Sequence, residues 1–193
     1  MNDSTNIKMS EQFRNGVFRA ASRTYGEKYM EPIIRKIYNL DESKGDENDA
    51  IDTNGIEKEI KASKVLKSTG KKKNMSTLEK IIYENNNDVV NRLIPFEYCF
   101  KTEYLSNIQN VKRDHFNQLI YVLLFQDCIK IFVSDKDNIS NIPNWCDKHG
   151  RYDELGKSGQ FPINKNNIKW HIENNLKLTL TWDEVYETAK TIK

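Results

Sequence analysis

Glu59 and Lys61 flank Ile60 in a segment that alternates between charged and apolar residues. Such alternation predicts a β-strand, and side chains two residues apart on a strand project from the same face. An acidic residue from the preceding segment, Asp49 or Asp52, can join this carboxylate and this ammonium group. Two carboxylates can hold Mg²⁺, which prefers oxygen ligands and keeps several waters. Bound Mg²⁺ polarises a phosphate and activates water, so the pattern predicts metal-assisted hydrolysis.

Lys61 can act in two ways in such a site. It can orient or deprotonate the attacking water, which needs a lowered lysine pKa, or it can neutralise charge that develops on the phosphorus. A competing interpretation is a solvated charged face on an edge strand, because this spacing recurs by chance among 28 acidic and 30 basic residues. Three features favour the site: Ile60 is apolar between charges, a strand and a turn lead into the segment, and a lysine-rich loop follows.

A hairpin is the element that would position these residues. Residues 49–52 alternate acidic and apolar side chains, as a short strand does. Residues 53–55, Thr-Asn-Gly, are typical of a turn. Residues 56–65 then alternate again. The segment therefore predicts two paired strands with one charged face.

Two carboxylates compete for the place beside Glu59. Asp49 and Asp52 both lie near the predicted turn, and a regular strand would put their side chains on opposite faces. Glu57 shares the face of Glu59 and can assist, although a surface charge is the favoured interpretation. The residues alone leave the first ligand open between Asp49 and Asp52.

The flanking segments predict helices packed on a mixed sheet. Apolar residues recur at helical spacing over residues 11–40, with a joint at Gly26 and Pro32 in the first turn of the second helix. Residues 1–10 are polar and are predicted to be disordered. The other predicted elements are a helix over 76–92, a strand over 96–100, an ambiguous stretch over 104–113 for which a helix is one interpretation, a hairpin of 119–125 and 128–134, a strand over 168–172, a turn at 174–175, a strand over 176–181 and a helix over 182–193. We therefore expect a single α+β (α/β-like) domain.

The segment around Glu59 resembles the PD-(D/E)xK nuclease superfamily, and within it the small type II restriction endonucleases. The positions that carry the resemblance are Asn48, Asp49, Ala50, Ile51, Asp52, Gly55, Glu57, Glu59, Ile60, Lys61 and Ser63. The resemblance implies that Asp49 and Glu59 are metal ligands, with the carbonyl of Ile60 as a further ligand. It also implies that Lys61 is the catalytic lysine, and that Asp52 is a turn residue or supports the ligands.

The resemblance extends to two other parts of the chain. The hairpin of residues 119–134 and the tail of residues 166–178 are similar to parts of that family. This implies a restriction-endonuclease-like mixed β-sheet flanked by helices in one nuclease domain over residues 11–193. Residues 64–103 have no counterpart and are interpreted as an extra segment.

Further residues of the family's site have weaker counterparts. Helical carboxylates complete the site in part of the superfamily, and Glu27 and Glu31 are the candidates here. The chain lacks the histidine cluster with which the restriction enzymes read bases, because its three histidines are scattered. The recognised bases therefore cannot be carried over.

By this resemblance the chain is expected to be a Mg²⁺-dependent type II restriction endonuclease. A homodimer would bind a short palindromic site in double-stranded DNA, and each subunit would cut one strand to leave 5′-phosphate and 3′-hydroxyl ends. A cognate DNA methyltransferase would protect the host DNA. The alternatives are a repair or junction-cleaving nuclease of the same superfamily and a non-catalytic DNA-binding protein.

Basic residues near the hairpin are predicted to contact the DNA backbone. They are Lys64, Lys67, Lys71, Lys72 and Lys73, together with His115 beyond them. The alternative is an ordinary surface loop and a solvated histidine. Residues 156–159, Gly-Lys-Ser-Gly, lack the spacing of a phosphate-binding P-loop.

Length, charge and cysteine content indicate how many domains the chain forms and in which compartment it is expected. The chain has 193 residues and a net charge of only +2, so any basic surface must come from local clustering. Three cysteines without CxxC spacing argue against a disulfide framework. The polar N-terminus lacks the apolar run of a signal peptide, and no stretch is apolar enough to span a membrane. We expect a cytoplasmic protein of one domain.

Overall fold

A computed structural model describes residues 3–19, 29–44, 48–68, 89–148 and 158–192 of the chain. Gly26, Glu27, His149, residues 156–157 and most of the helix predicted over 76–92 lie outside these described residues. Within them, the structure contains no helix long and apolar enough to cross a membrane.

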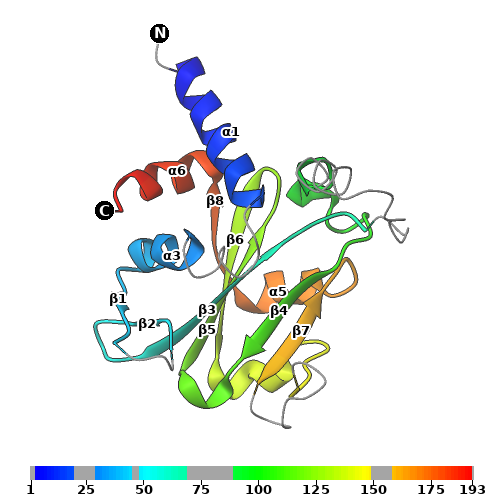
Figure 1. Cartoon of the computed structure of the whole chain (residues 1–193). Coiled ribbons are helices and arrows are strands. Elements are labelled where there is room, and N and C mark those ends of the chain that lie inside the picture. The colour runs from blue at the N-terminus through cyan, green and yellow to red at the C-terminus, as the bar shows by residue number, and fades with distance from the viewer. Residues whose placement is uncertain (1–2, 20–28, 45–47, 69–88, 149–157, 193) are drawn as a thin grey trace, which may run out of the picture.

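A six-stranded sheet forms the centre of the molecule (Figure 1). Its strands, in spatial order, are β1 (Asp41–Glu42), β2 (Ala50–Ile51), β3 (Glu57–Lys64), β5 (Gln118–Leu124), β6 (Cys128–Asp135) and β8 (Leu176–Thr181). Only β3 and β5 pair in parallel, and the other neighbours are antiparallel. The fold is therefore α+β, with a mostly antiparallel mixed sheet, and the predicted fold class is confirmed at this level.

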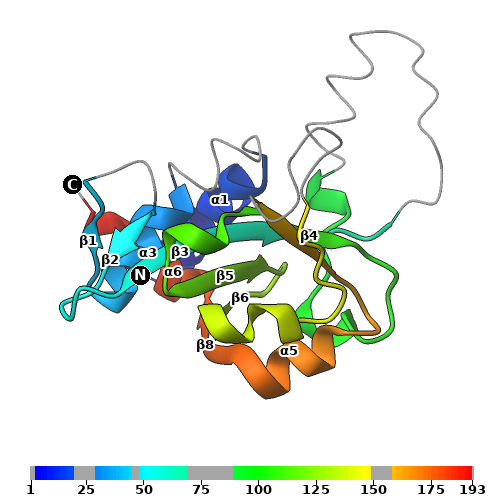
Figure 2. The same cartoon turned by 90° about the horizontal axis from the view of Figure 1, so that it is seen from below.

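The two faces of the sheet are covered differently, and we number them by their side chains. The first face bears Glu59 and Lys61, with Tyr121 opposite Lys61 on β5. The second face bears Ile60, with Ile120 opposite it. Figure 2 shows helices on one side of the sheet and a two-stranded ribbon with a single helix on the other.

Three helices close the second face: α1 (Asp3–Arg19), α3 (Glu31–Tyr38) and α6 (Trp182–Lys190). Their contribution to the core includes Phe18 and Ile34, which are fully buried against strand residues such as Ile60. Thr181 and Glu184 form a capping box that starts α6. These helices bury one apolar stripe each, as their spacing predicts.

The first face is covered by the ribbon of β4 (Ser106–Val111) and β7 (Gly159–Ile163) and by α5 (Ile168–Asn175). Beneath α5, the Tyr121 hydroxyl lies 2.9 Å from Nδ1 of His171 and accepts a hydrogen bond of 3.0 Å from Asn175. Burial lowers the pKa of His171 to about 4, so this histidine is neutral at pH 7. His171 is therefore a buried structural residue.

Most predicted elements near the site are confirmed. The hairpin of β2 and β3, the hairpin of β5 and β6, strand β8 and helix α6 all form where the sequence patterns place them. Residues 11–19 and 29–38, within the predicted helical region, are helical, and Pro32 lies in the first turn of α3. The extra segment includes residues 64–68 and 89–103, which connect β3 to β4.

Five predictions are wrong. Residues 168–172 are helical and the predicted turn at 174–175 belongs to the same helix, because Ile168, His171 and Asn175 are buried at a spacing of three and four. Residues 96–98 form a 3-10 turn, η2 (Phe96–Tyr98), which follows Pro95 and whose first N–H donates to Asp127. Residues 104–113 contain strand β4 instead of a helix, since β7 pairs with them from about fifty residues away. Residues 3–10 belong to α1 and not to a disordered tail, because α1 has no glycine before Gly16 and is anchored by Val17 and Phe18.

Candidate active site

The β2–β3 hairpin brings Asp49 beside Glu59 and Lys61. Ala50 pairs with Lys58 across the hairpin, and the Asp49 N–H donates to the Lys58 carbonyl at 3.0 Å. Gly55 in the turn has a φ of 77°, a conformation that glycine adopts without strain. The local pairing therefore fixes the register between the acidic residue before β2 and the charged face of β3.

The three side chains form one compact group. The Lys61 ammonium lies 2.5 Å from Oε1 of Glu59 and 3.3 Å from Oδ2 of Asp49. The same Asp49 oxygen accepts a hydrogen bond of 2.7 Å from the Ile60 N–H. Glu59 is only 4% exposed, so its carboxylate faces the interior side of the group. The structure thus brings together the catalytic residues that the sequence predicted.

Asp52 belongs to the turn and not to this group. Its Oδ1 accepts hydrogen bonds of 2.9 Å from the N–H groups of Asn54 and Ile56, and its Oδ2 lies 3.0 Å from the Lys58 ammonium. The Ile56 hydrogen bond, above all, lowers the pKa of Asp52. Of the two competing carboxylates, Asp49 is therefore the one beside Glu59, and Asp52 stabilises the turn.

The carbonyl of Ile60 faces the edge of β3 at which the Asp49 carboxylate lies. Strand β2 pairs with β3 only as far as Lys58, so among the described residues no strand lies beside this edge of β3 from Glu59 onward. The N–H and C=O groups of one strand residue point toward the same edge. Since the Ile60 N–H points to Asp49, its carbonyl points to this open edge as well. The Ile60 carbonyl therefore faces the same edge as the Asp49 carboxylate, and the Lys61 ammonium links that carboxylate to Glu59.

The electrostatics of the group favour a bound cation. Burial raises the pKa of Glu59 to about 7, the Lys61 charge opposes this rise, and the Asp49 charge adds to it. Burial lowers the pKa of Lys61, but the charges of Glu59 and Asp49 outweigh burial and hold that pKa above its usual value. Lys61 is therefore protonated in this state, which supports a role as a fixed cation over a role as a base.

The donor set suits Mg²⁺. Within the described residues, no group of three or more His, Cys, Asp or Glu side chains is placed to hold a metal ion. Mg²⁺ needs fewer protein ligands than that, because it retains several waters of its octahedral shell. Asp49, Glu59 and the Ile60 carbonyl would hold the ion, and Lys61 already places one positive charge between the two carboxylates.

The predicted DNA contacts are scattered. Lys64 lies on the second face of β3, where its ammonium donates to the Phe18 carbonyl at 2.7 Å and burial lowers its pKa. Lys67 is exposed, and its backbone pairs with Arg92. His115 is half-buried in the 3-10 turn η3 (Arg113–His115), beyond the end of β4. Lys71, Lys72 and Lys73 lie outside the described residues.

Two further candidate carboxylates, Glu31 and Glu57, lie apart from the Asp49–Glu59–Lys61 group. Glu31 begins α3 on the second face, across the sheet from the group. Glu57 is half-buried, and its backbone is bonded to Asn117 through both its N–H and its carbonyl. Neither contacts Asp49 or Glu59 in any described hydrogen bond or ion pair, which favours the surface interpretation of Glu57.

Lys112 is a residue that the sequence interpretation missed. It follows β4 and is half-buried, and its charge is among those that lower the pKa of Glu59. The position of Lys112 depends on how β4 crosses β3, which no local sequence pattern reveals.

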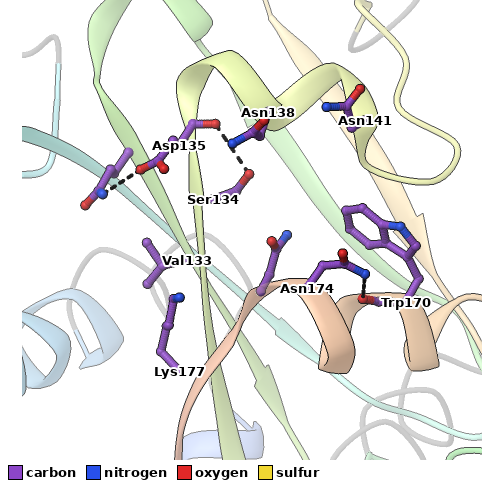
Figure 3. A pocket seen from close by; sticks show the side chains of 10 residues that line it. Val133, Ser134, Asp135, Asn138, Asn141, Trp170, Asn174 and Lys177 are labelled. Carbon is purple, nitrogen blue, oxygen red and sulfur yellow. Dashed lines mark hydrogen bonds between the residues drawn. The ribbon is translucent and has the colours of Figure 1, made fainter.

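A pocket of about 520 Å³ opens elsewhere on the molecule, between α5 and the 3-10 helix η4 (Lys136–Asn141) (Figure 3). Amide side chains, Trp170 and Lys177 dominate its lining. Its one acid, Asp135, accepts a hydrogen bond of 2.6 Å from Gln118. Because it has neither paired carboxylates nor a nucleophile with a base, this pocket is no competitor to the Asp49–Glu59–Lys61 group.

No model of a known protein family matches the chain, and no curated protein is similar to it in sequence. The residues and geometry of the site therefore carry the information about function.

Replacing Asp52 with alanine separates the two carboxylates experimentally. Asp52→Ala removes two turn hydrogen bonds and leaves Lys58 without its carboxylate, so we expect a lower melting temperature. Any catalytic activity should survive below that temperature, whereas Asp49→Asn should lose it. Circular dichroism melts and cleavage assays on both variants check this, and a catalytic defect confined to Asp52→Ala would reverse the assignment.

Proposed function

We propose that this protein is a Mg²⁺-dependent endonuclease that hydrolyses phosphodiester bonds in double-stranded DNA. The observation that carries the proposal is the grouping of Asp49, Glu59 and Lys61 at the open edge of β3, with the Ile60 carbonyl facing them. Two acids and a lysine that a β-hairpin brings together in a helix-flanked mixed sheet are the arrangement expected of a restriction-endonuclease-like nuclease.

The chemistry follows from the roles of these groups. Mg²⁺, when bound, would polarise the phosphate and supply an activated water. Asp49 and Glu59 would hold it in place, and the Ile60 N–H keeps the Asp49 carboxylate oriented. Lys61 would stabilise the negative charge that develops on the phosphorus, as its protonated state allows.

The ribbon beside the site favours duplex DNA as the substrate. Strand β4 contacts β3, and its Ser106 hydroxyl donates to the Ser63 hydroxyl at 2.7 Å. The exposed side chains of Asn107 and Gln109 project from this strand, opposite its buried residues. A major groove admits a two-stranded β-ribbon, and amides can pair with adenine edges.

Within this function, we favour a type II restriction endonuclease. One such group per chain cuts one strand, so a homodimer would be needed to cut both strands of a palindromic site. The products would carry 5′-phosphate and 3′-hydroxyl ends, and a cognate methyltransferase would protect the host DNA in the cytoplasm.

Incubation of the purified protein with plasmid and phage DNA, with Mg²⁺ or with EDTA, tests the proposal. Discrete fragments that require Mg²⁺ support a restriction enzyme, and sequencing their ends identifies the site and the cut position. Cleavage of branched DNA alone would indicate a junction-cleaving enzyme. Binding without cleavage of any of these DNAs would overturn the nuclease proposal, and light scattering would report the predicted dimer.

A further inference from the structure

Strand β4 contacts β3 from the first face, and the two strands run in opposite directions (Figure 1). At one end, Ser106 is bonded to Ser63. At the other end, the Asn117 N–H donates to the Glu57 carbonyl at 2.9 Å, and the Asn117 side chain accepts from the Glu57 N–H at 3.1 Å. The chain between these anchors therefore passes over the part of β3 that bears Glu59 and Lys61. Lys112 lies midway in this crossing segment.

The side chain of Lys112 has no partner within the described residues, in contrast to its neighbour. The Arg113 guanidinium lies 3.2 Å from both Asp147 and Ser140, and it stacks 5.8 Å from the Trp145 ring. Arg113 thus holds the turn in place. Among the described residues, no hydrogen bond or ion pair engages the Lys112 ammonium, yet its charge acts on the buried Glu59 carboxylate. A half-buried cation whose charge acts on the Glu59 carboxylate is available to a ligand.

The charges of the proposed site show what that ligand would be. With a divalent cation bound, the carboxylates of Asp49 and Glu59 would cancel its charge. Lys61 would then give the site a net charge of +1. A phosphodiester carries one negative charge, and attack by hydroxide adds a second in the transition state. Lys61 alone leaves one of these charges unmatched. A second lysine on the other wall of the site supplies the missing charge.

We propose that Lys112 is a phosphate-binding residue that faces Lys61 across the site and contacts a non-bridging oxygen of the phosphate being cut. The identification of the ligand as a phosphate rests on the proposed nuclease function. The placement of Lys112 beside Glu59 does not depend on that function. Because a nearby positive charge repels a divalent cation and attracts an anion, Lys112 has opposite effects on the two ligands. A residue with a merely structural role would not produce this pair of opposite effects.

Lys112→Gln is the decisive variant. Without DNA, we expect it to bind Mn²⁺ about three- to tenfold more tightly than the unmodified protein, because it removes one repulsive charge. With DNA, we expect weaker binding and a salt dependence reduced by about one phosphate contact. Under saturating DNA, kcat should fall by about 10²-fold, as for the loss of one charge-stabilising donor. Lys112→Arg should restore part of the loss.

Lys136→Gln is the matched control. Lys136 is half-exposed and lies 4.0 Å from Asp114 beside the same turn, and its charge is not among the main causes of the pKa shift of Glu59. Mn²⁺ binding is measured by electron paramagnetic resonance on the full chain, DNA binding by fluorescence anisotropy, and folding by circular dichroism. Unchanged Mn²⁺ affinity in a folded Lys112→Gln variant would overturn the placement of Lys112. Wild-type cutting by that variant would overturn its phosphate role while the nuclease function stands. Tighter Mn²⁺ binding in a protein that cuts no DNA would support the placement and overturn the function.

Discussion

Glu59→Gln is expected to abolish Mg²⁺-dependent DNA cleavage while leaving the protein folded. The variant replaces a ligand oxygen with a neutral amide of the same shape, so metal-derived stabilisation of several kcal/mol is lost, which corresponds to about 10³-fold in rate. Its stability should stay the same or rise. Burial raises the pKa of Glu59 to about 7, which means that the folded protein disfavours the charged carboxylate, and glutamine removes that charge.

Single-turnover cleavage of plasmid DNA and a thermal melt on the same preparation measure both effects. Glu57→Gln is the matched control, since it makes the same change two residues earlier on the same face, where the described bonds to Asn117 involve only the Glu57 backbone. We expect the control to cut at nearly the wild-type rate. Cutting at the wild-type rate by Glu59→Gln would remove Glu59 from the site.

Local sequence patterns were sufficient for the hairpin that carries the site. Alternation over residues 56–65 predicted β3 and placed Glu59 and Lys61 on one face, and the structure confirms both. The hairpin of β5 and β6 was equally clear, because its runs of apolar residues are separated by only a short turn. In these elements, local propensity and tertiary packing favour the same structure.

The elements and site features that local patterns did not predict depend on contacts between residues far apart in the sequence. Strand β4 has its partner β7 about fifty residues later, so nothing within residues 104–113 favours a strand over a helix. Helix α5 reads Ile-Lys-Trp-His-Ile at its start, which fits both a period of two and a helical period. The choice between Asp49 and Asp52 depended on which one the turn engages, and the orientation of Lys64 depended on the contact with α1.

Lys61→Met is expected to lower kcat by about 10²- to 10³-fold, in the range found for loss of one group that stabilises developing charge. DNA binding without metal should change little, because the Lys61 ammonium is paired with two carboxylates in the metal-free group. Lys64→Met is the matched control. Lys64 lies on the same strand but on the opposite face, where it bonds to the Phe18 carbonyl, so its loss should affect stability slightly and cutting hardly at all.

Lys61→Arg distinguishes the two roles of this lysine. The charges of Glu59 and Asp49 hold the pKa of Lys61 above its usual value, so the residue is a poor base and a good fixed cation. Arginine keeps the positive charge but cannot be deprotonated in a protein. If the fixed charge is what matters, Lys61→Arg should retain measurable Mg²⁺-dependent cutting that Lys61→Met has lost. An arginine variant that binds DNA and Mn²⁺ normally, yet is as inactive as the methionine variant, would exclude the fixed-cation role. That result would leave proton transfer through Lys61 as the function of this side chain.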